Sequence, residues 1–261
     1  MVIVGGGYIA TEFTGILHGI GVEVTQLYRG ELFLRGFDLD LRQHVAEEMQ
    51  KKGIDLQFNT DVTSIEKLAN GKLLLTLKDG SQKETSCVMY ATGRVPNIER
   101  LNLEKARIET HKGAIVVDEN YKTNRSHIYA IGDVINKKQL TPVALAEAMH
   151  VVADLCGGTK RDIDYDIIPS AVFCQPNIGT VGITEEQSEE RFPSDFEVYR
   201  SAFRPMKNTL SGNPERTLMK LIVQKSTQRI LGLHMAGPDA AEITQGFAVA
   251  IKAGATKEDF D

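Results

Sequence analysis

The sequence predicts an α/β chain in which a βαβαβ unit carries an inserted antiparallel sheet and an α+β region follows. Three observations predict this fold. The first 35 residues read as strand, glycine turn, helix and strand, the order of a parallel βαβ unit. Residues 62–88 read as short strands joined by turns. From residue 167 onward, strand patterns run consecutively before the last helices, as in α+β regions.

Periodicity and turn residues place the elements of the first part. Gly53 ends a helical pattern, and the pairs Asn70–Gly71 and Asp79–Gly80 join three strands of a meander, at 61–68, 72–80 and 86–93. The first helix places four apolar residues at helical spacing, Ile9, Phe13, Ile16 and Leu17. Strands are expected at 1–4, 22–28 and 54–59, and helices at 8–19 and 38–52.

The same patterns place the elements of the second part. A strand is expected at 128–133 and a helix at 142–156, and the polar run at 157–166 is typical of a linker or loop. Strands are then expected at 172–184, 196–203, 217–224 and 229–237, and helices at 240–252 and from 257.

Composition limits the classes of function. With 261 residues, 42% of them hydrophobic, the chain can form one large or two medium domains. Its net charge of -5 argues against nucleic acid and against an anionic membrane surface as partners. No apolar run approaches the ~20 residues of a membrane-spanning helix. The N-terminus does not read as a signal peptide, so a cytosolic protein is expected.

The three cysteines lie far apart in the sequence. Cys87, Cys156 and Cys174 form no CxxC pair and have no metal-ligand spacing. Isolated thiols in a reducing compartment are therefore expected, rather than a redox pair or a metal site.

The stretch VGGGYIA is the strongest motif. Gly5, Gly7 and Ala10 have the GxGxxA spacing, between a predicted strand and a predicted helix. In such a turn the first glycine permits the tight strand-to-helix connection and the second lets the backbone approach a pyrophosphate. The small third residue lets the helix pack on the strand, and the helix N-terminus faces the phosphates. The motif predicts a dinucleotide site.

The end of the second strand predicts which dinucleotide binds. NAD sites place a carboxylate there for the ribose hydroxyl, but this chain has Tyr28 followed by Arg29, with Arg35 a few residues later. Guanidinium groups suit an anionic 2'-phosphate, so the sequence predicts NADPH. The alternative is that the two arginines only solvate a loop.

Two later stretches, and the helix start that follows them, suggest a second cofactor. Gly93 follows a predicted strand at the edge where a ligand would lie, and Asp133 ends another and could accept hydrogen bonds from a ribitol hydroxyl. Thr141 precedes Pro142 at the start of a helix, where backbone N–H groups are free. Each signal is weak by itself, because an Asp after a strand is usually a turn or a cap.

Taken together, VIVGGGYIATE, RGELFLR, ATGRVPN, IYAIGD, LTPVA, IGTVGIT and QGFAVAIKAGATKEDF occur in an order that resembles the FAD-dependent pyridine nucleotide-disulfide oxidoreductases. Within that family the chain is most similar to bacterial glutathione reductases. The resemblance implies a Rossmann-type NADPH-binding domain at 1–98, a region at 99–166 that completes an FAD domain, and an α+β dimerisation domain at 167–261. It also implies a homodimer that reduces glutathione disulfide.

The resemblance implies roles for individual residues. Gly6, Ile9 and Glu12 would line the NADPH site, and the Tyr8 ring would cover the flavin. Glu12 would pair with a lysine that this chain does not contain. NADPH or FAD contacts are implied at Gly5, Gly6, Gly7, Tyr8, Ile9, Glu12, Arg29, Arg35, Gly93, Arg94, Asp133, Gln139, Thr141 and Ala171.

The chain also departs from the family pattern. Family members carry a CxxxxC redox disulfide in an N-terminal FAD half, and a His-Pro-Thr with a Glu near the C-terminus. Neither segment is present in this sequence. We therefore expect a fragment without a catalytic residue and without disulfide reductase activity of its own. Neither Cys156 nor Cys174 has a neighbour at redox spacing that could substitute.

The substrate is less firmly implied than the family. Met149 stands where glutathione-specific relatives often carry an arginine, and trypanothione reductases are similar in lacking it. Lipoamide dehydrogenase or mercuric reductase are further alternatives, although Arg29 and Arg35 argue against the NAD-dependent lipoamide dehydrogenase. A nucleotide-binding or dimerisation module without redox chemistry is an alternative of a different class.

Overall fold

The computed structural model describes residues 1–159 and 162–261 of the chain. Unit 1 joins Met1–Gly93 to Asp166–Asp261, and unit 2 is Arg94–Tyr165. Lys160 and Arg161, which fall in the expected linker, lie outside the described residues. Among the described residues, no helix is both long enough and apolar enough to cross a membrane.

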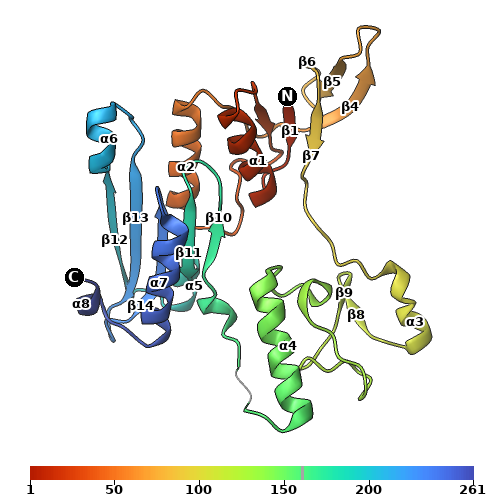
Figure 1. The fold of residues 1–261 in the computed structure, drawn as a ribbon, viewed down its shortest axis with the longest axis vertical. Coiled ribbons are helices and arrows are strands. Elements are labelled where there is room, and N and C mark those ends of the chain that lie inside the picture. The colour runs from red at the N-terminus through yellow and green to blue at the C-terminus, as the bar shows by residue number, and fades with distance from the viewer. Residues whose placement is uncertain (160–161) are drawn as a thin grey trace. The chain divides into compact units, whose positions relative to one another are not determined.

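Unit 1 begins with a parallel sheet in the order β3-β2-β1-β7. The strand β1 is buried throughout, and it pairs with β2 on one side and with β7 on the other. The carboxyl ends of these strands therefore meet at one edge, where ligands of open parallel sheets bind. The four strands are β1 (Val2–Val4), β2 (Thr25–Leu27), β3 (Asp55–Gln57) and β7 (Val88–Tyr90) (Figure 1).

A three-stranded antiparallel sheet is inserted before β7. It consists of β4 (Val62–Lys67), β5 (Leu73–Leu77) and β6 (Gln82–Thr85). Gly71 and Gly80 have positive φ, as the Asn-Gly and Asp-Gly pairs predict. The assignment of 86–93 to this meander was wrong, because β6 takes the third place and β7 pairs in parallel with β1. β6 reads QKET and lacks the apolar alternation that identifies a strand.

The helices of this part are α1 (Tyr8–Gly19) and α2 (Leu39–Lys51), close to the expected bounds. The apolar residues at helical spacing do not form the buried face of α1, because Phe13 is 41% exposed and Ile16 is 50% exposed. The buried residues of α1 are small: Ala10, Thr11, Thr14 and Gly15. A helix that follows a tight glycine turn approaches the strands closely, so its small residues turn inward.

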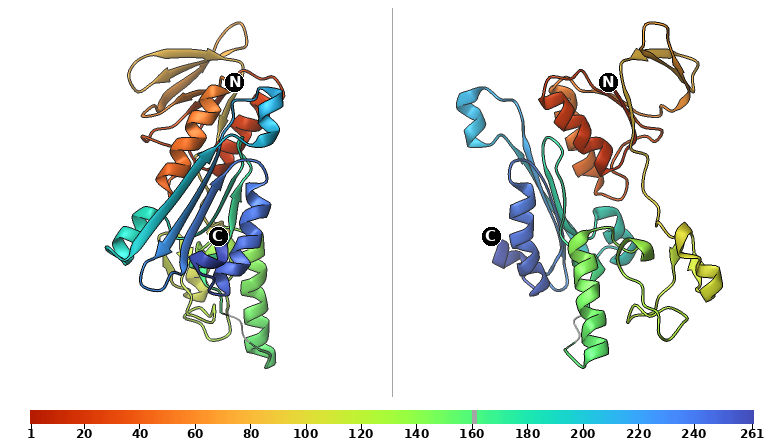
Figure 2. Two further views of the ribbon diagram at one scale, coloured as in Figure 1. Left: turned by 90° about the vertical axis from the view of Figure 1, so that its left-hand side faces the viewer. Right: turned by 45° about the vertical axis from the view of Figure 1, so that its right-hand side comes forward.

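The second part of unit 1 is a five-stranded antiparallel sheet in the order β10-β11-β14-β13-β12. The helix α7 lies along one face of this sheet (Figure 2) and contacts β11 and β14. The short helices α5 and α6 were not expected, because neither is long enough to show a helical period. The elements are β10 (Ser170–Val172), β11 (Ile178–Gly182), α5 (Glu185–Arg191), β12 (Phe196–Phe203), α6 (Met206–Ser211), β13 (Thr217–Gln224), β14 (Ile230–Ala236), α7 (Ala240–Lys252) and α8 (Lys257–Phe260).

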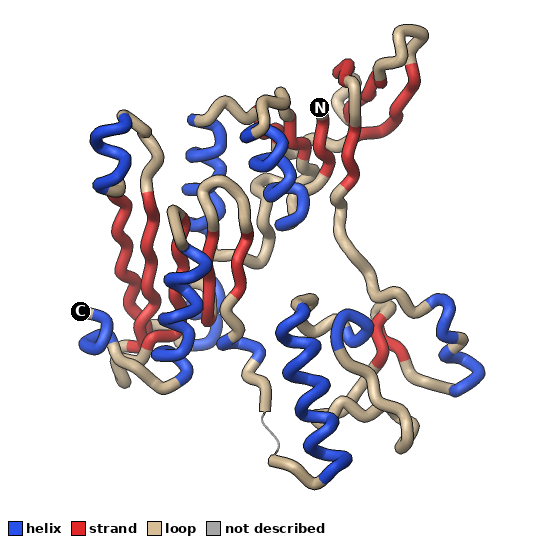
Figure 3. The backbone as a smooth tube through the Cα atoms, in the orientation of Figure 1, coloured by secondary structure: helices blue, strands red, loops and turns tan. Residues whose placement is uncertain are grey.

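Unit 2 is built mainly on the helix α4 (Figure 3). The strand expected at 128–133 was wrong. A strand needs a ladder of partners, and within the described residues this stretch has a single bridge, between Lys122 and Tyr129, before a 3₁₀ turn begins at Gly132. The elements are η1 (Glu99–Leu101), α3 (Leu103–Ala106), β8 (Thr110–His111), β9 (Ala114–Ile115), η2 (Gly132–Ile135), α4 (Thr141–Cys156) and η3 (Tyr165–Ile167), which begins at the unit's last residue.

One hydrophobic core joins the two stretches of unit 1. The helix α2 contacts both β3 of the parallel sheet and β14 of the antiparallel sheet. Its buried apolar residues pack with those of the preceding loop and of the antiparallel sheet, so the two sheets share one apolar interior. The buried members of this core include Phe33, Leu34, Leu41, Val45, Met49, Val172, Ile178, Leu218 and Ala236.

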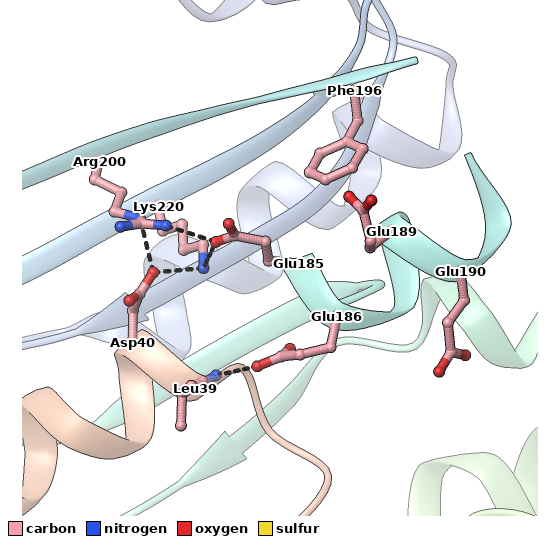
Figure 4. A pocket seen from close by; sticks show the side chains of 9 residues that line it. All are labelled: Leu39, Asp40, Glu185, Glu186, Glu189, Glu190, Phe196, Arg200 and Lys220. Atoms are coloured by element: carbon pink, nitrogen blue, oxygen red, sulfur yellow. Dashed lines mark hydrogen bonds and ion pairs between the residues drawn. The ribbon is translucent and has the colours of Figure 1, made fainter. Parts of the chain in front are cut away.

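A buried ion cluster reinforces the same junction. The ammonium of Lys220 on β13 is buried and donates to both carboxylate oxygens of Asp38 at 2.8 Å. It also donates to Asp40 and Glu185 at 2.6 Å each, and Arg200 pairs with the same two carboxylates (Figure 4). The cluster therefore ties α2, α5, β12 and β13 together.

The surroundings of Asp38 keep it charged although it is buried. Burial by itself raises the pKa of Asp38, but the hydrogen bond and charge of Lys220 and the amide of Glu185 outweigh it and lower the pKa. Burial likewise lowers the pKa of Lys220, and its three carboxylate partners outweigh burial and raise it. Removal of Lys220 would therefore leave the Asp38 carboxylate buried without its cation.

We predict that Lys220→Met destabilises the fold by about 3–5 kcal/mol, because the charge of Asp38 then has no buried cation. The measurement is the free energy of unfolding in urea. The matched control is Lys72→Met, since Lys72 forms an exposed pair with Glu84 that contributes little. Similar small losses in both variants would contradict the prediction.

Candidate dinucleotide site

The three glycines after β1 differ in what each position demands. Gly5 has φ +149°, and a Cβ there would overlap the carbonyl of Ala91 after β7. A Cβ on Gly6 would overlap the ring of Tyr28, which follows β2. Both glycines are therefore explained by the fold itself.

Gly7 has no such explanation within the described residues. It is the N-cap of α1 with φ -88° and ψ 177°, which any residue adopts. Outside its own turn, no described heavy atom lies within 4 Å of a Cβ built there. No described side chain caps α1 at this end. This cradle fits the pyrophosphate of a dinucleotide, which a glycine would let approach the backbone.

The third position of the motif packs into the interior beneath the turn. Ala10 is fully buried and belongs to a small core with Ile3 and Val24. Tyr8, the first residue of α1, is exposed, while Ile9 is half-buried. The turn therefore presents Gly7 and Tyr8 outward and anchors the helix through Ala10.

Arg29 and Arg35 lie on the loop after β2, at the same edge of the sheet as the glycine turn. Both side chains are exposed, and neither pairs with a carboxylate in the part of the chain that the structure describes. The two arginines that the sequence assigns to a 2'-phosphate thus lie on an exposed loop at this edge. Their freedom from internal partners leaves both available to an anion.

Sequence reasoning missed the contacts that join this loop to the glycine turn. The backbone amide of Leu34 donates to the carbonyl of Gly6 at 2.6 Å. The side-chain amide of buried Gln26, on β2 just before the loop, donates to the carbonyl of Gly5 at 3.0 Å. The motif spacing contains no signal for either contact. Gln26 could have been noticed as a polar residue in an apolar strand.

Three further predicted site residues, Gly93, Glu12 and Ala171, lie in unit 1. Gly93 has φ +128° and is exposed three residues after β7 ends. Glu12 on α1 accepts a hydrogen bond at 2.9 Å from the amide of Phe173, two residues after Ala171 on β10. The structure thus brings Glu12 to the end of β10, a contact across 161 positions of sequence.

The remaining predicted site residues lie in unit 2. Arg94 forms an ion pair with Asp133 at the start of η2, and Gln139 donates to Asn136 at 3.0 Å. Thr141 is exposed at the first turn of α4, which no described side chain caps. The open helix N-terminus fits a phosphate group.

A buried carboxylate supports the turn that carries Asp133. Glu147 on α4 accepts from the amide of Gly132 at 2.6 Å and from the Tyr165 hydroxyl at 2.6 Å. Burial, and then the bond to Glu147, raises the pKa of Tyr165, so this phenol stays protonated and donates. Sequence reasoning did not single out Glu147, since it lies on a helix among apolar residues.

The cysteines show no redox arrangement. Cys87 and Cys156 are exposed, Cys174 is buried, and all three are free thiols. Burial raises the pKa of Cys174 to about 12, which leaves almost no thiolate at neutral pH. The expectation that Cys174 does not replace a redox pair is consistent with this environment.

Comparison with known proteins identifies the family. Residues 1–148 match the model of the pyridine nucleotide-disulphide oxidoreductase family. The chain belongs to the pyridine nucleotide-disulphide oxidoreductases. Residues 168–261 of this oxidoreductase also match the model of the family's dimerisation domain, which covers the five-stranded sheet with α7.

Individual relatives extend the match over the whole chain. The oxidoreductase is 49% identical over 261 residues to a glutathione reductase of Burkholderia cepacia, covering 99% of this chain and 58% of the relative. It is 50% identical to a chloroplastic/mitochondrial glutathione reductase of Pisum sativum, covering 99% and 47%. It is 40% identical to a trypanothione reductase of Leishmania donovani, covering 100% and 54%. The chain thus spans about half the length of these relatives.

We predict that Gly7→Ala weakens NADPH binding by roughly tenfold or more, which corresponds to ~1.4 kcal/mol. The added methyl group occupies only space that a pyrophosphate would need, so we expect the stability to stay within about 1 kcal/mol, because the lower entropy of the unfolded chain and the poorer N-capping by alanine oppose each other. Calorimetric titration and urea unfolding measure the two effects.

The matched control for this variant is Gly19→Ala at the other end of α1, where a Cβ also meets open space. It should leave NADPH binding unchanged. Unchanged binding in Gly7→Ala would show that no pyrophosphate lies against this turn.

Proposed function

We propose that the first part of unit 1 is a Rossmann-type site for NADPH. The observation that carries the proposal is Gly7, whose backbone and surroundings would accept a Cβ and which leaves an open cradle at a helix N-terminus. Arg29 and Arg35 would bind the 2'-phosphate, since they are exposed and unpaired within the described residues at the same edge. Gly5, Gly6, Tyr8, Ile9, Glu12, Gly93 and Ala171 would complete the NADPH side.

We further propose that unit 2 contributes to an FAD site. The N-terminus of α4 at Thr141 would face a phosphate, because its backbone N–H groups have no side-chain cap within the described residues. Asp133 would accept hydrogen bonds from a ribitol hydroxyl, while Arg94 orients its carboxylate. Glu147 would hold the Gly132–Asp133 turn, and Gln139 lies near the start of the same helix.

The whole protein is proposed to reduce glutathione disulfide. The names of the Burkholderia and Pisum relatives support this substrate. When bound, NADPH would supply two electrons as a hydride and FAD would relay them, and with one further proton they would cleave a disulfide into two thiols. The residues of this chain would bind and orient the nucleotides, and the region at 167–261 would form a homodimer.

A second candidate substrate is trypanothione disulfide. Met149, which is 69% exposed on α4, stands where an arginine would attract the acidic glutathione tripeptide. The flavin-containing enzyme should consume NADPH faster with glutathione disulfide than with trypanothione disulfide. The opposite order would favour the second candidate.

The domain bounds at 1–98, 99–166 and 167–261 and the cytosolic location stay predictions.

We predict that replacing both Arg29 and Arg35 by methionine removes the preference for NADPH over NADH. The wild-type chain should bind NADPH at least about tenfold more tightly, or ~1.4 kcal/mol. Calorimetric titration with both coenzymes measures the ratio. An unchanged ratio in the double variant would contradict the assignment of these arginines.

We predict that the protein associates as a twofold dimer through the region at 167–261. Phe247 and Val249 expose apolar surface on α7, with Val249 66% exposed. Val249→Glu should weaken association by roughly tenfold or more, because a dimer would bury its charge. The control Ile65→Glu changes an exposed residue of β4 and should have no effect. A wild-type monomer at every concentration in sedimentation equilibrium would contradict the dimer.

A further inference from the structure

The loop that carries Arg29 and Arg35 is held by a third arginine. Arg42 lies on the first turns of α2, and its guanidinium donates to two backbone carbonyls of the loop. Its Nη2 lies 2.6 Å from the Leu32 oxygen, and its Nε lies 2.8 Å from the Phe33 oxygen. The planar fork of an arginine can hold two neighbouring carbonyls at once, and a lysine ammonium cannot reproduce that geometry.

The residue held next to these carbonyls has a strained backbone. Leu34 has φ +57°, a region that a bulky side chain rarely occupies. Its side chain is buried in the core of unit 1, and its amide bonds to the Gly6 carbonyl. Strained residues persist where the surroundings determine their conformation, and they gather at functional sites.

The backbone conformation of Leu34 sets the direction of the chain at Arg35. Arg35 comes directly after Leu34, so the direction in which the chain leaves Leu34 sets where the Arg35 guanidinium can reach. The loop is fixed at both sides of this point. Arg42 holds the carbonyls before it, and Asp38 anchors the chain after it through Lys220.

We propose that Arg42 is a positioning residue that determines selectivity for a 2'-phosphate. It keeps the loop in the one conformation that places Arg35 beside the glycine turn. This inference rests on the proposed NADPH function, because it requires that Arg35 bind the 2'-phosphate. The proposed role of Arg42 does not require it to touch the coenzyme, since it acts through the bonds of its Nε and Nη2 to Phe33 and Leu32.

The test compares Arg42→Met and Arg42→Lys with the wild-type chain. Calorimetric titrations use NADPH, NADH and adenosine 2',5'-bisphosphate, which carries the 2'-phosphate without nicotinamide. In both variants we expect a roughly tenfold loss of NADPH and bisphosphate affinity, the scale of hydrogen bonds to a charged group, with NADH affinity unchanged. A general loss of structure would instead weaken the binding of all three ligands.

The matched control is Arg204→Met. Arg204 also holds two backbone carbonyls, those of Asn213 at 3.0 Å and Asn208 at 2.8 Å, but on the loop that contains α6. This variant should keep the wild-type ratio of NADPH to NADH affinity. Circular dichroism checks that each variant is folded, and Arg42→Lys decides the question if Arg42→Met does not fold.

The outcomes separate this inference from the proposed function. If folded Arg42→Met or Arg42→Lys keeps the wild-type ratio of NADPH to NADH affinity, the positioning role is overturned while the NADPH site stays in place. A wild-type ratio in Arg42→Lys alone would mean that the charge of residue 42, rather than the planar guanidinium of arginine, supports phosphate binding. A wild-type chain without preference for NADPH would overturn the proposed function and this inference together.

Discussion

The buried carboxylate of Asp38 is the contact on which unit 1 depends. One of its oxygens accepts from the amide of Asp40 in the first turn of α2, and the other from the amide of Glu185 in the first turn of α5. Both accept from the ammonium of Lys220. A single side chain thus satisfies donors of two helix N-termini and a buried cation, any of which would cost free energy if left unpaired.

Asp38 also affects the candidate site, because the loop that carries Arg29 and Arg35, here called the arginine loop, ends at Asp38. The loop is pinned at Gly6 through Leu34, on α2 through Arg42, and on the antiparallel sheet through Lys220. Residues of the dimerisation region therefore help to shape the surface that would receive the coenzyme. The shared apolar core has the same effect, since buried Phe33 and Leu34 pack with residues of β10, β11 and β13.

The sequence predicted most of this fold and the local part of the site. Helices at 8–19, 38–52, 142–156 and 240–252 matched to within a residue or so, because their periodic patterns are long and end in capping residues or glycine. The failures had physical causes. Polar β6 has no alternation, the stretch at 128–133 has one bridged pair within the described residues, and α1 buries its small face instead of its apolar one.

By itself, the sequence determined the features that depend on neighbouring residues: the glycine turn, the arginines in place of an acidic residue after β2, and the family. Only the tertiary structure decided which glycine the fold requires and which leaves room for a ligand. It also decided that Asp38 meets Lys220 across 182 positions and that Arg42 holds the arginine loop. Such contacts have no periodicity or fixed spacing, because they arise when distant segments pack, and a single sequence does not show them.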